Sequence, residues 1–453
     1  MPYAISEKRL KDFIALPAAQ RSLILLEAIE AQHLYHFERN AAYRQTLTTR
    51  GVLSQRSATP SRLGPGDLGR LLRPAALTFK SYIEHIGPFP QYDPPGFLRW
   101  LSDQLSIPLS PNRWPAFRRR YSTLEALLCD VERIYADLGL EIVTSTGTSG
   151  RASIVARTAT TVELAVQAFF TGIHCSWRVE RGTALVFVMP KDTRVAMARV
   201  ARFGTRELDW TAQSPVYYTM PFSATPDQLR IRAGRTFLPG LSGLIERRVL
   251  YPFMAWANEH LATSRYVAVT LARLRECARD GRPLMLLGGL TQLHVIARQA
   301  AVSLPPGSRV ATGGGMKEQY PFTPGQIRAD LRAAFGNAPV SDVYGMAEAN
   351  WAAFECPQGN HHIPPWVYAV VTDDDDQIVS RPDATGLLAF FDPVGGGELI
   401  PPFFQTTDRV RLLNGGCEYD PRLVCPCGYD SAYIVGGIQR VDLVEEAGCA
   451  AEI

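Results

Sequence analysis

The spacing of apolar residues separates helical from extended stretches along the chain. Helical spacing runs over residues 6–48 and is followed by a connection containing Gly, Pro and Ser at about 51–67. The apolar stripes of this first stretch are formed by Leu10, Phe13, Ile14, Leu23, Leu25, Leu26 and Ile29. Further helices are predicted at Leu124–Leu138, Thr160–Ile173, Leu290–Ala301 and Pro324–Phe335.

Short apolar runs predict strands between these helices. They lie at Ala184–Met189, Pro283–Leu287, Ser308–Ala311 and Pro339–Val343. Strands that alternate with helices are typical of parallel βαβ units, so the pattern predicts an α/β enzyme. The four acidic residues Asp373–Asp376 predict a β-turn between antiparallel strands, and not a metal cluster.

Composition narrows the function classes without choosing one. A chain of 453 residues with 46% hydrophobic and 20% charged residues can bury a large core. The basic spots Arg118–Arg120 and Arg247–Arg248 are short and lack interleaved aromatics, so we expect no nucleic-acid partner. No run approaches a membrane span, the N-terminus lacks an apolar signal core, and eight cysteines are too sparse for a disulfide scaffold. We therefore expect a cytoplasmic protein.

The segment at 144–153 carries the first chemical signal. Its sequence Thr-Ser-Thr-Gly-Thr-Ser-Gly-Arg-Ala-Ser follows the apolar-ending run Leu138–Val143. Glycines let backbone amides approach phosphate oxygens, and small hydroxyl groups add donors, so the loop suits a nucleoside triphosphate. It lacks the spacing of a mononucleotide P-loop, and a flexible linker would have a similar composition. ATP is the ligand that we expect.

Three later segments add nucleotide-facing chemistry. Val310–Lys317 ends a strand in three glycines, where a flat base could lie against bare backbone. Val340–Glu348 ends another strand in an aromatic residue, a glycine and a carboxylate. Thr406–Val410 contains Asp408, which could accept both ribose hydroxyls. Four such pieces in one chain favour ATP binding.

Together these segments resemble the adenylate-forming (ANL) superfamily of acyl-, aryl- and aminoacyl-activating enzymes. Gly-Gly-Gly-Met-Lys at 313–317, Asp-Val-Tyr-Gly-Met-Ala-Glu at 342–348 and the run from Glu355 to Trp366 are most similar to the acyl-protein synthetase (LuxE) branch, related to phenylacetate-CoA ligases. Pro74–Lys80 extends the resemblance over essentially the whole chain. It implies the fold of the superfamily's N-terminal domain: a helical N-terminal region over 1–120, an ATP-binding adenylation core over 121–410 and a short C-terminal tail over 411–453, in place of the usual mobile domain.

The resemblance also implies roles for single residues. Six loop residues would cradle the β and γ phosphates: Thr144, Ser145, Thr146, Gly147, Thr148 and Gly150. The rest of the nucleotide set is Gly313, Gly314 and Gly315 beside adenine, Tyr344 and Gly345 near the base, and Asp408 on the ribose. Glu348 would hold Mg²⁺. Taken alone, Tyr344 could equally be a core aromatic and Glu348 a carboxylate at a helix start.

Two departures from the superfamily concern its lysines. The phosphate loop usually closes with a lysine, but here Arg151 follows Gly150, so the cationic clamp is Arg151 or is absent. Lys317 is the nearest alternative and could neutralise the carboxylate or the α-phosphate, unless it is simply solvated. Full-sized members also carry a catalytic lysine in a mobile C-terminal domain, whereas residues 408–453 contain no lysine. Another cation would then have to serve.

Cysteines supply two further predictions. Gly448-Cys449-Ala450 resembles the Gly-Cys near the terminus of acyl-protein synthetases, where the thiol accepts the acyl group; an incidental terminal thiol is the alternative. Separately, Cys356 with His361 or His362, plus Cys425 and Cys427, form a donor set that suits tetrahedral Zn²⁺. The resemblance favours His362. Cys417 is a substitute ligand, and metal-free reduced thiols are the alternative.

The resulting prediction is an ATP-dependent carboxylate activator that forms an acyl adenylate and releases pyrophosphate. The acyl group then passes to a thiol, either Cys449, a carrier protein or coenzyme A, and a reductase is a further candidate partner. Predicted cofactors are ATP, Mg²⁺ and a structural Zn²⁺. A coenzyme A or carrier-protein ligase without a protein-bound thioester, and a non-catalytic ATP-binding scaffold, remain alternatives. Five aromatics suit an acyl chain or aryl ring, although core packing explains them equally well: Trp210, Tyr217, Tyr218, Phe222 and Phe237.

Overall fold

The structure is a computed structural model, and its described residues form two compact units. It describes residues 12–52, 63, 65–145, 152–180, 182–207, 214–221, 225–228, 238, 240–299, 301–315, 320–393, 397–416 and 418–441. Unit 1 combines Met1–Tyr82, Phe97–Ser110 and Glu348–Ile453, and unit 2 combines Ile83–Gly96 and Pro111–Ala347. Neither unit is continuous in sequence. Among the described residues, no helix is both long and apolar enough to cross a membrane.

Unit 2 is built on five parallel strands in the order β5-β4-β6-β7-β8. Their bounds are Ala184–Pro190 (β4), Val216–Met220 (β5), Leu284–Gly289 (β6), Arg309–Gly313 (β7) and Val340–Gly345 (β8). Strands β4 and β6 are buried almost throughout, as expected for parallel strands covered on both faces. The four strands predicted from apolar runs are confirmed, and β5 is additional.

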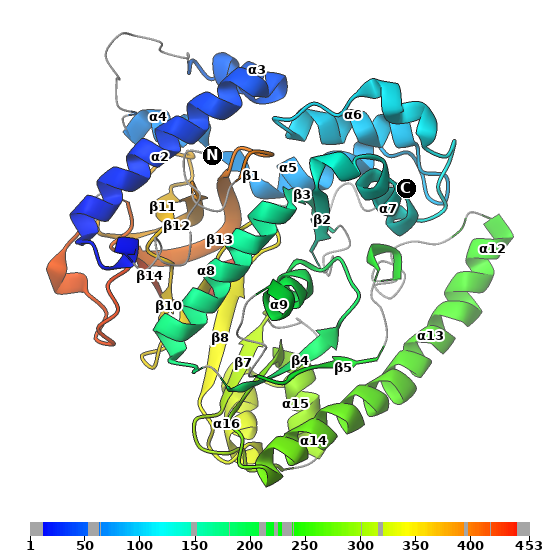
Figure 1. The fold of residues 1–453 in the computed structure, drawn as a ribbon, viewed down its shortest axis with the longest axis vertical. Coiled ribbons are helices and arrows are strands. Elements are labelled where there is room, and N and C mark those ends of the chain that lie inside the picture. Colours follow the sequence, from blue (N-terminus) through cyan, green and yellow to red (C-terminus); the bar gives the residue numbers. More distant parts are fainter. Residues whose placement is uncertain are drawn as a thin grey trace. The chain divides into compact units, whose positions relative to one another are not determined.

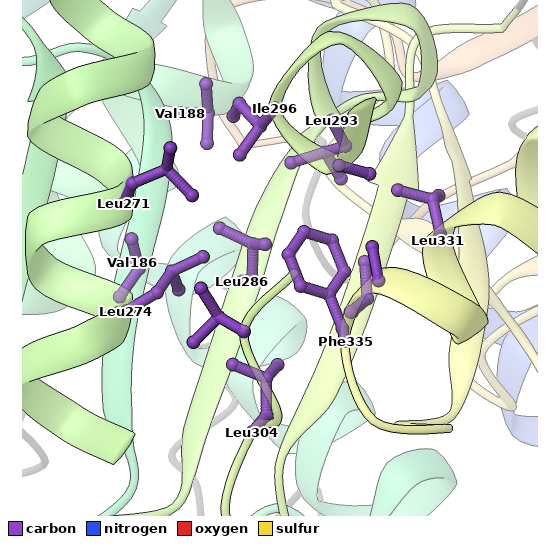
Figure 2. Packing of buried hydrophobic residues seen from close by; sticks show 14 of the residues in the cluster. Val186, Val188, Leu271, Leu274, Leu286, Leu293, Ile296, Leu304, Leu331 and Phe335 are labelled. Carbon is purple, nitrogen blue, oxygen red and sulfur yellow. The ribbon is translucent and has the colours of Figure 1, made fainter. Parts of the chain in front are cut away.

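Helices α14 (Thr263–Arg279), α15 (Leu290–Gln299) and α16 (Pro324–Ala334) lie between successive strands in the chain and enclose the core of unit 2 (Figure 1). Figure 2 shows Val186 and Leu286 of the strands converging with Leu274, Ile296 and Phe335 from the helical side. Helix α16 begins at a capping box, in which Thr323 and Gln326 satisfy each other's backbone N–H groups. The predicted βαβ architecture therefore holds in this unit.

A separate two-stranded sheet in unit 2 carries the predicted phosphate loop. Helix α7 (Leu124–Ile134) leads to β2 (Leu140–Thr144), which pairs antiparallel with β3 (Ile154–Thr158). Helix α8 (Ala159–Trp177) follows at once, capped by the Thr158 side chain. The loop thus joins two strands of a hairpin. Strand β3 was not anticipated, because its five residues run straight into the helix.

Unit 1 contains a mainly antiparallel sheet in the order β11-β12-β13-β14-β10-β9, with β1 parallel to β13. The bounds are Arg73–Pro74 (β1), Ala352–Glu355 (β9), His361–His362 (β10), Tyr368–Thr372 (β11), Asp383–Phe391 (β12), Phe403–Leu413 (β13) and Tyr433–Arg440 (β14). Between β11 and β12, Asp376 N donates to Asp373 O and Asp373 N to Gln377 O. The predicted turn at Asp373–Asp376 is confirmed.

The predicted helical stretch 6–48 contains two long helices, α2 (Ala18–Arg39) and α3 (Ala41–Thr49). Asn40 separates them, because its extended backbone ends α2 while its side chain accepts from Tyr43 N and caps α3. Leu25 and Ile29 pack against strand residues of unit 1, as the predicted stripe requires. Leu23, also assigned to that stripe, is 49% exposed.

The remaining helices are distributed over both units. Helix α4 begins inside the connection predicted at 51–67. Their bounds are Pro65–Leu71 (α4), Ala75–Lys80 (α5), Pro94–Gln104 (α6), Ala196–Glu207 (α9), Gly240–Ile245 (α12) and Tyr251–Ala257 (α13), with 3₁₀ turns at Ser81–Glu84, Pro111–Ala116, Ala136–Leu138 and Pro421–Leu423 and π-helical turns at Glu246–Leu250 and Asn258–Ala262. The predicted division at residues 120 and 410 stays a prediction.

Candidate functional site

The base of the predicted phosphate loop is closed by a pair of serines. Ser145 N donates to Ser153 O at 3.1 Å, and Ser153 N donates to Ser145 Oγ at 2.9 Å. Thr144, at the end of β2, is fully buried, and its hydroxyl has no hydrogen-bond partner among the described residues. A buried hydroxyl without a partner at the mouth of this loop is available to a ligand oxygen. Four of the predicted phosphate ligands lie outside the described residues: Thr146, Gly147, Thr148 and Gly150.

The triple glycine follows β7 directly. Gly313 ends the strand, and Gly314 and Gly315 have φ angles of 77° and 64°, in the left-handed region that favours glycine. No atom lies within 4 Å of a Cβ added at Gly314 or Gly315, so backbone conformation, and not crowding, calls for glycine there. This bare, open backbone fits the flat base that the sequence predicts beside it.

Lys317 and Cys449 lie outside the described residues, as do Arg151 and Cys417.

Strands β7 and β8 bring two predicted motifs to the same edge of the parallel sheet. Gly313 is in register with Val343, and Thr312 Oγ1 donates to Asp342 Oδ1 at 2.6 Å, which ties the two strands together just before their ends. Tyr344 is half-buried and Gly345 is exposed. In open α/β sheets, ligands bind beyond the carboxyl ends of the strands, where these residues lie.

The acidic members of the predicted set belong to unit 1. Glu348 follows β8 in a turn and is half-buried. Asp408 lies within β13, is half-buried, and its backbone N donates to Thr406 Oγ1 at 3.1 Å. The roles of Glu348 in Mg²⁺ binding and of Asp408 in ribose binding stay predictions.

A second cluster gathers all four predicted metal ligands. The ligand atoms of Cys356, His362, Cys425 and Cys427 lie within 4.8 Å of one another. Two thiols, Cys356 Sγ and Cys425 Sγ, are 3.8 Å apart, and Cys427 Sγ lies 3.2 Å from His362 Nε2. A tetrahedral Zn²⁺ with Zn–S bonds of about 2.3 Å separates its sulfur ligands by about 3.8 Å.

Local structure selects His362 over His361 as the nitrogen donor. The two histidines form β10, and successive side chains in a strand point to opposite faces. The second ring nitrogen of His362, Nδ1, lies 3.0 Å from Ser431 Oγ, a contact that orients the imidazole with Nε2 toward the thiols. The choice of His362 from the resemblance agrees with this geometry.

Burial sets the protonation of the cluster. Desolvation lowers the pKa of His362 to about 4, so its imidazole is neutral near pH 7, the form that coordinates metals. Desolvation likewise raises the pKa of Cys427 to about 12. Burial also opposes ionisation of Cys425, but the Cys427 backbone N–H and the Asn360 side chain lower its pKa overall. The donor set, its spacing and its burial all fit a cation such as Zn²⁺.

No family model and no curated protein sequence matches this chain. Among solved structures, it is similar to 2-hydroxyisobutyryl-CoA ligase crystallised in an open conformation with 2-HIB-AMP and CoA: TM-score 0.57, 16% identity, covering 98% of this chain and 80% of the ligase. Two further states of that ligase align as well. The thioesterification state gives a TM-score of 0.56 at 15% identity over 94% and 69% of the two chains, and the postadenylation state gives 0.52 at 14% over 98% and 72%.

The chain has the fold of this CoA ligase, which is the fold that the resemblance to adenylate-forming enzymes implies. At this level of identity the likeness establishes the fold and leaves the residue roles to the site itself. The predicted fold class is confirmed, and membership of the acyl-protein synthetase branch stays a prediction.

The structure also reveals a residue that the sequence analysis missed. Arg157 of β3 is buried, and its Nη2 donates to Ala347 O at 2.6 Å. This bond joins the phosphate-loop hairpin to the Tyr344–Ala347 segment, both in unit 2. An arginine inside the apolar run Ile154–Thr158 was the available signal, since a buried guanidinium needs a fixed acceptor.

Proposed function

We propose that this protein activates a carboxylic acid with ATP and passes the acyl group to a thiol. A carboxylate oxygen attacks the α-phosphorus, the bond from that phosphorus to the α–β bridging oxygen breaks, and pyrophosphate leaves. A thiol sulfur then attacks the acyl carbon, the bond to AMP breaks, AMP leaves, and the thiol proton passes to solvent. The observation that carries the proposal is the bond, within unit 2, from Arg157 of the β2–β3 hairpin to the Tyr344–Ala347 segment; the same hairpin carries the loop base Thr144–Ser145.

The residue roles in this proposal combine the described geometry of unit 2 with roles that the resemblance implies. The hydroxyl of Thr144 is suited to a phosphate oxygen, and Gly314 and Gly315 offer bare backbone to the base. In this proposal Glu348 holds Mg²⁺, which supplies positive charge to the phosphates, and Asp408 holds the ribose. Positioning and electrostatic stabilisation are then the main catalytic contributions. Lys317 is the candidate cation for the transferring group.

Two thiol acceptors compete within this proposal. The similar ligase structures contain CoA together with an acyl adenylate, which favours a CoA-type acceptor and an acid–CoA or carrier-protein ligase. The Gly448-Cys449 resemblance favours transfer to the protein itself. We expect Cys449→Ala to abolish a protein-bound thioester in the second case and to leave product formation within about twofold of wild type in the first.

The decisive experiment is ATP–pyrophosphate exchange with a panel of fatty, aryl, hydroxy and amino acids, on the wild type and Cys449→Ala. We expect exchange with one acid class in both proteins, because adenylation precedes any role for the thiol. Exchange with no acid, in protein that still binds ATP, would favour the non-catalytic scaffold. Single-turnover assays with labelled acid then separate label on the polypeptide from label on added CoA.

We also propose that Cys356, His362, Cys425 and Cys427 hold a structural Zn²⁺. With four protein ligands there is no open position for a substrate, so the ion would cross-link chain segments almost 70 residues apart. Cys425→Ser should lose the metal, as measured by elemental analysis. Its free energy of unfolding, from urea denaturation, should fall by about 2–4 kcal/mol. Cys129→Ser, at an exposed cysteine of unit 2, is the control and should keep one zinc per chain. Freshly purified wild type without stoichiometric zinc would refute the site.

A further inference from the structure

In the part of the chain that the structure describes, the hairpin that carries the predicted phosphate loop has no third strand along the outer edge of β2. Within the described part of the chain, β2 pairs with β3 alone. Two-stranded hairpins are marginally stable by themselves. The outer edge of β2 is instead held by side chains and by one isolated bridge, so the loop depends on contacts that a third strand would normally supply.

Arg194 and Glu132 make those contacts. Glu132 Oε1 accepts from Ile142 N at 2.8 Å, while Arg194 Nη1 donates to Ile142 O at 3.2 Å. The backbone of Arg194 contributes as well, because its carbonyl accepts from Thr144 N at 2.7 Å beside the Thr144–Val195 bridge. The side chain and backbone of one residue thus fix two positions of β2, the second of which is the first residue of the loop.

The Arg194 guanidinium is itself held rigidly. Its side chain is 4% exposed and donates to Glu125 Oε1 at 2.7 Å and to Glu132 Oε2 at 2.8 Å, both on α7. Burial opposes its charge, but the bonds and charge of Glu132 outweigh burial and raise the pKa of Arg194. Buried ion pairs are costly to break, because the group left behind keeps an uncompensated charge. Moving the Arg194 guanidinium away would leave the Glu125 and Glu132 carboxylates without this partner.

A second arginine extends the network along the same strand. Arg199 Nε donates to Glu141 Oε2 at 3.1 Å, and its Nη2 lies 3.5 Å from Glu132 Oε1. Glu125 and Glu132 of α7, Arg194 just before α9 and Arg199 of α9 therefore hold β2, where Arg199 bonds Glu141 of the strand itself. Glu125, Glu132, Glu141, Arg194 and Arg199 belong to none of the sequence motifs that carry the resemblance.

We propose that Arg194 is a positioning residue for the nucleotide. It fixes β2 in place. Through β2 it also fixes the Thr144 hydroxyl and the two hydrogen bonds between Ser145 and Ser153 in the geometry that receives phosphate oxygens. The ordering of these groups is then complete before ATP arrives, which lowers the entropic cost of binding. This role rests on the ATP binding in the proposed function, and it concerns a residue that does not touch the nucleotide.

Arg194→Lys tests the role without removing the positive charge. A lysine keeps the backbone carbonyl to Thr144, but one ammonium cannot bond both glutamates and Ile142 O in the fixed fork that a guanidinium offers. We expect the Kd for ATP, by equilibrium titration, and the KM for ATP in exchange to rise about tenfold, since charge-assisted bonds of this kind are lost. The kcat and the KM for the acid should change less than about threefold, because the reacting groups remain.

Two further variants make the result specific. Arg309→Lys replaces another enclosed arginine, which bonds Ser341 and the Trp177 carbonyl at the start of β7, and it should leave the ATP affinity unchanged. Glu132→Gln keeps an acceptor for Ile142 N but removes the charge facing Arg194, and should raise the Kd for ATP less than Arg194→Lys does.

The outcomes separate this role from the proposed function. If the wild type binds no ATP, both fail together. If the wild type binds ATP and Arg194→Lys binds it equally well, only the positioning role fails. A variant that merely unfolds at lower temperature, with an unchanged Kd measured well below that temperature, also overturns the positioning role.

Discussion

At the scale of single residues, two buried histidines of α2 make the stability of unit 1 depend on pH. His33 is 3% exposed and His36 is inaccessible to solvent. His36 Nδ1 lies 2.6 Å from Ser106 Oγ and Nε2 lies 3.1 Å from Gln32 Oε1, whereas His33 Nδ1 lies 3.3 Å from the Tyr43 hydroxyl. Desolvation lowers the pKa of His36 to about 3, helped by Arg73, and that of His33 to about 4. Both imidazoles are neutral in the folded state near pH 7.

Mild acid should therefore destabilise unit 1. The unfolded chain binds protons at these histidines below about pH 6.5, and the folded state resists them until about pH 3–4, so stability is full above 6.5 and falls as the pH drops through that window. At pH 5 we expect a loss of about 2 kcal/mol for each histidine. Urea unfolding at pH 7.5 and 5.0 measures the difference.

The same measurement on substituted proteins assigns the loss. His36→Gln cannot take up the proton and should show a smaller drop between the two pH values. His260→Gln, at an exposed histidine of unit 2, should show the same drop as the wild type. Equal pH dependence in the wild type and His36→Gln would contradict the assignment.

At the scale of elements, β11 and β12 approach each other so closely that one position of β12 has no room for a side chain. A Cβ added at Gly386 of β12 would lie 2.1 Å from Thr372 O and 3.0 Å from Thr372 C, both backbone atoms of β11. Backbone cannot rotate away as a flexible side chain can. The sheet of unit 1 therefore requires glycine at this position for packing alone.

Gly386→Ala should destabilise the protein by about 2–3 kcal/mol, because the strands must separate to admit one methyl group. Gly325→Ala is the matched control, since no atom lies within 4 Å of its added Cβ, its φ is ordinary and it lies in the first turn of α16. That substitution should be neutral or stabilise by up to about 1 kcal/mol. Urea denaturation curves of the two variants compare them directly, and equal midpoints would argue against the close approach.

Elements with a local signature were predictable from sequence, and those that depend on distant partners were not. Strands β4 and β6 were found because burial on both faces makes them continuous apolar runs. Strand β5 was missed because it lies at the sheet edge and its tyrosines are half-buried. The four members of the Cys/His cluster could be named because cysteine and histidine side chains are recognisable metal donors in the sequence itself. Arg157 and Arg194 were not named as functional residues, because the acceptors that define their roles lie 190 and 52–69 positions away in the sequence.

At the scale of the whole molecule, the two units differ in how the chain builds them. Unit 2 takes most of its residues from one stretch, Pro111–Ala347, whereas unit 1 joins three stretches from opposite halves of the sequence. Leu25 and Ile29 of α2 pack with Tyr368, Phe391 and Phe403. Arg21 Nη2 donates to Asp430 Oδ2 at 2.9 Å, a bond across 409 positions.

This discontinuity has a consequence for the protein while it is being made. Helix α2 is complete at Arg39, but the first strand it packs against begins at Tyr368, 329 residues later. At roughly 5–20 residues per second, a ribosome needs about 16–66 s to cover that distance. During that interval Leu25 and Ile29 of α2 have their early partners on α3 and α4 but not those on the strands, and unit 2 is complete in sequence only at Ala347, close to the end of the interval. A chain that stops near residue 350 would therefore contain all of unit 2 but leave Leu25 and Ile29 of α2 without their strand partners.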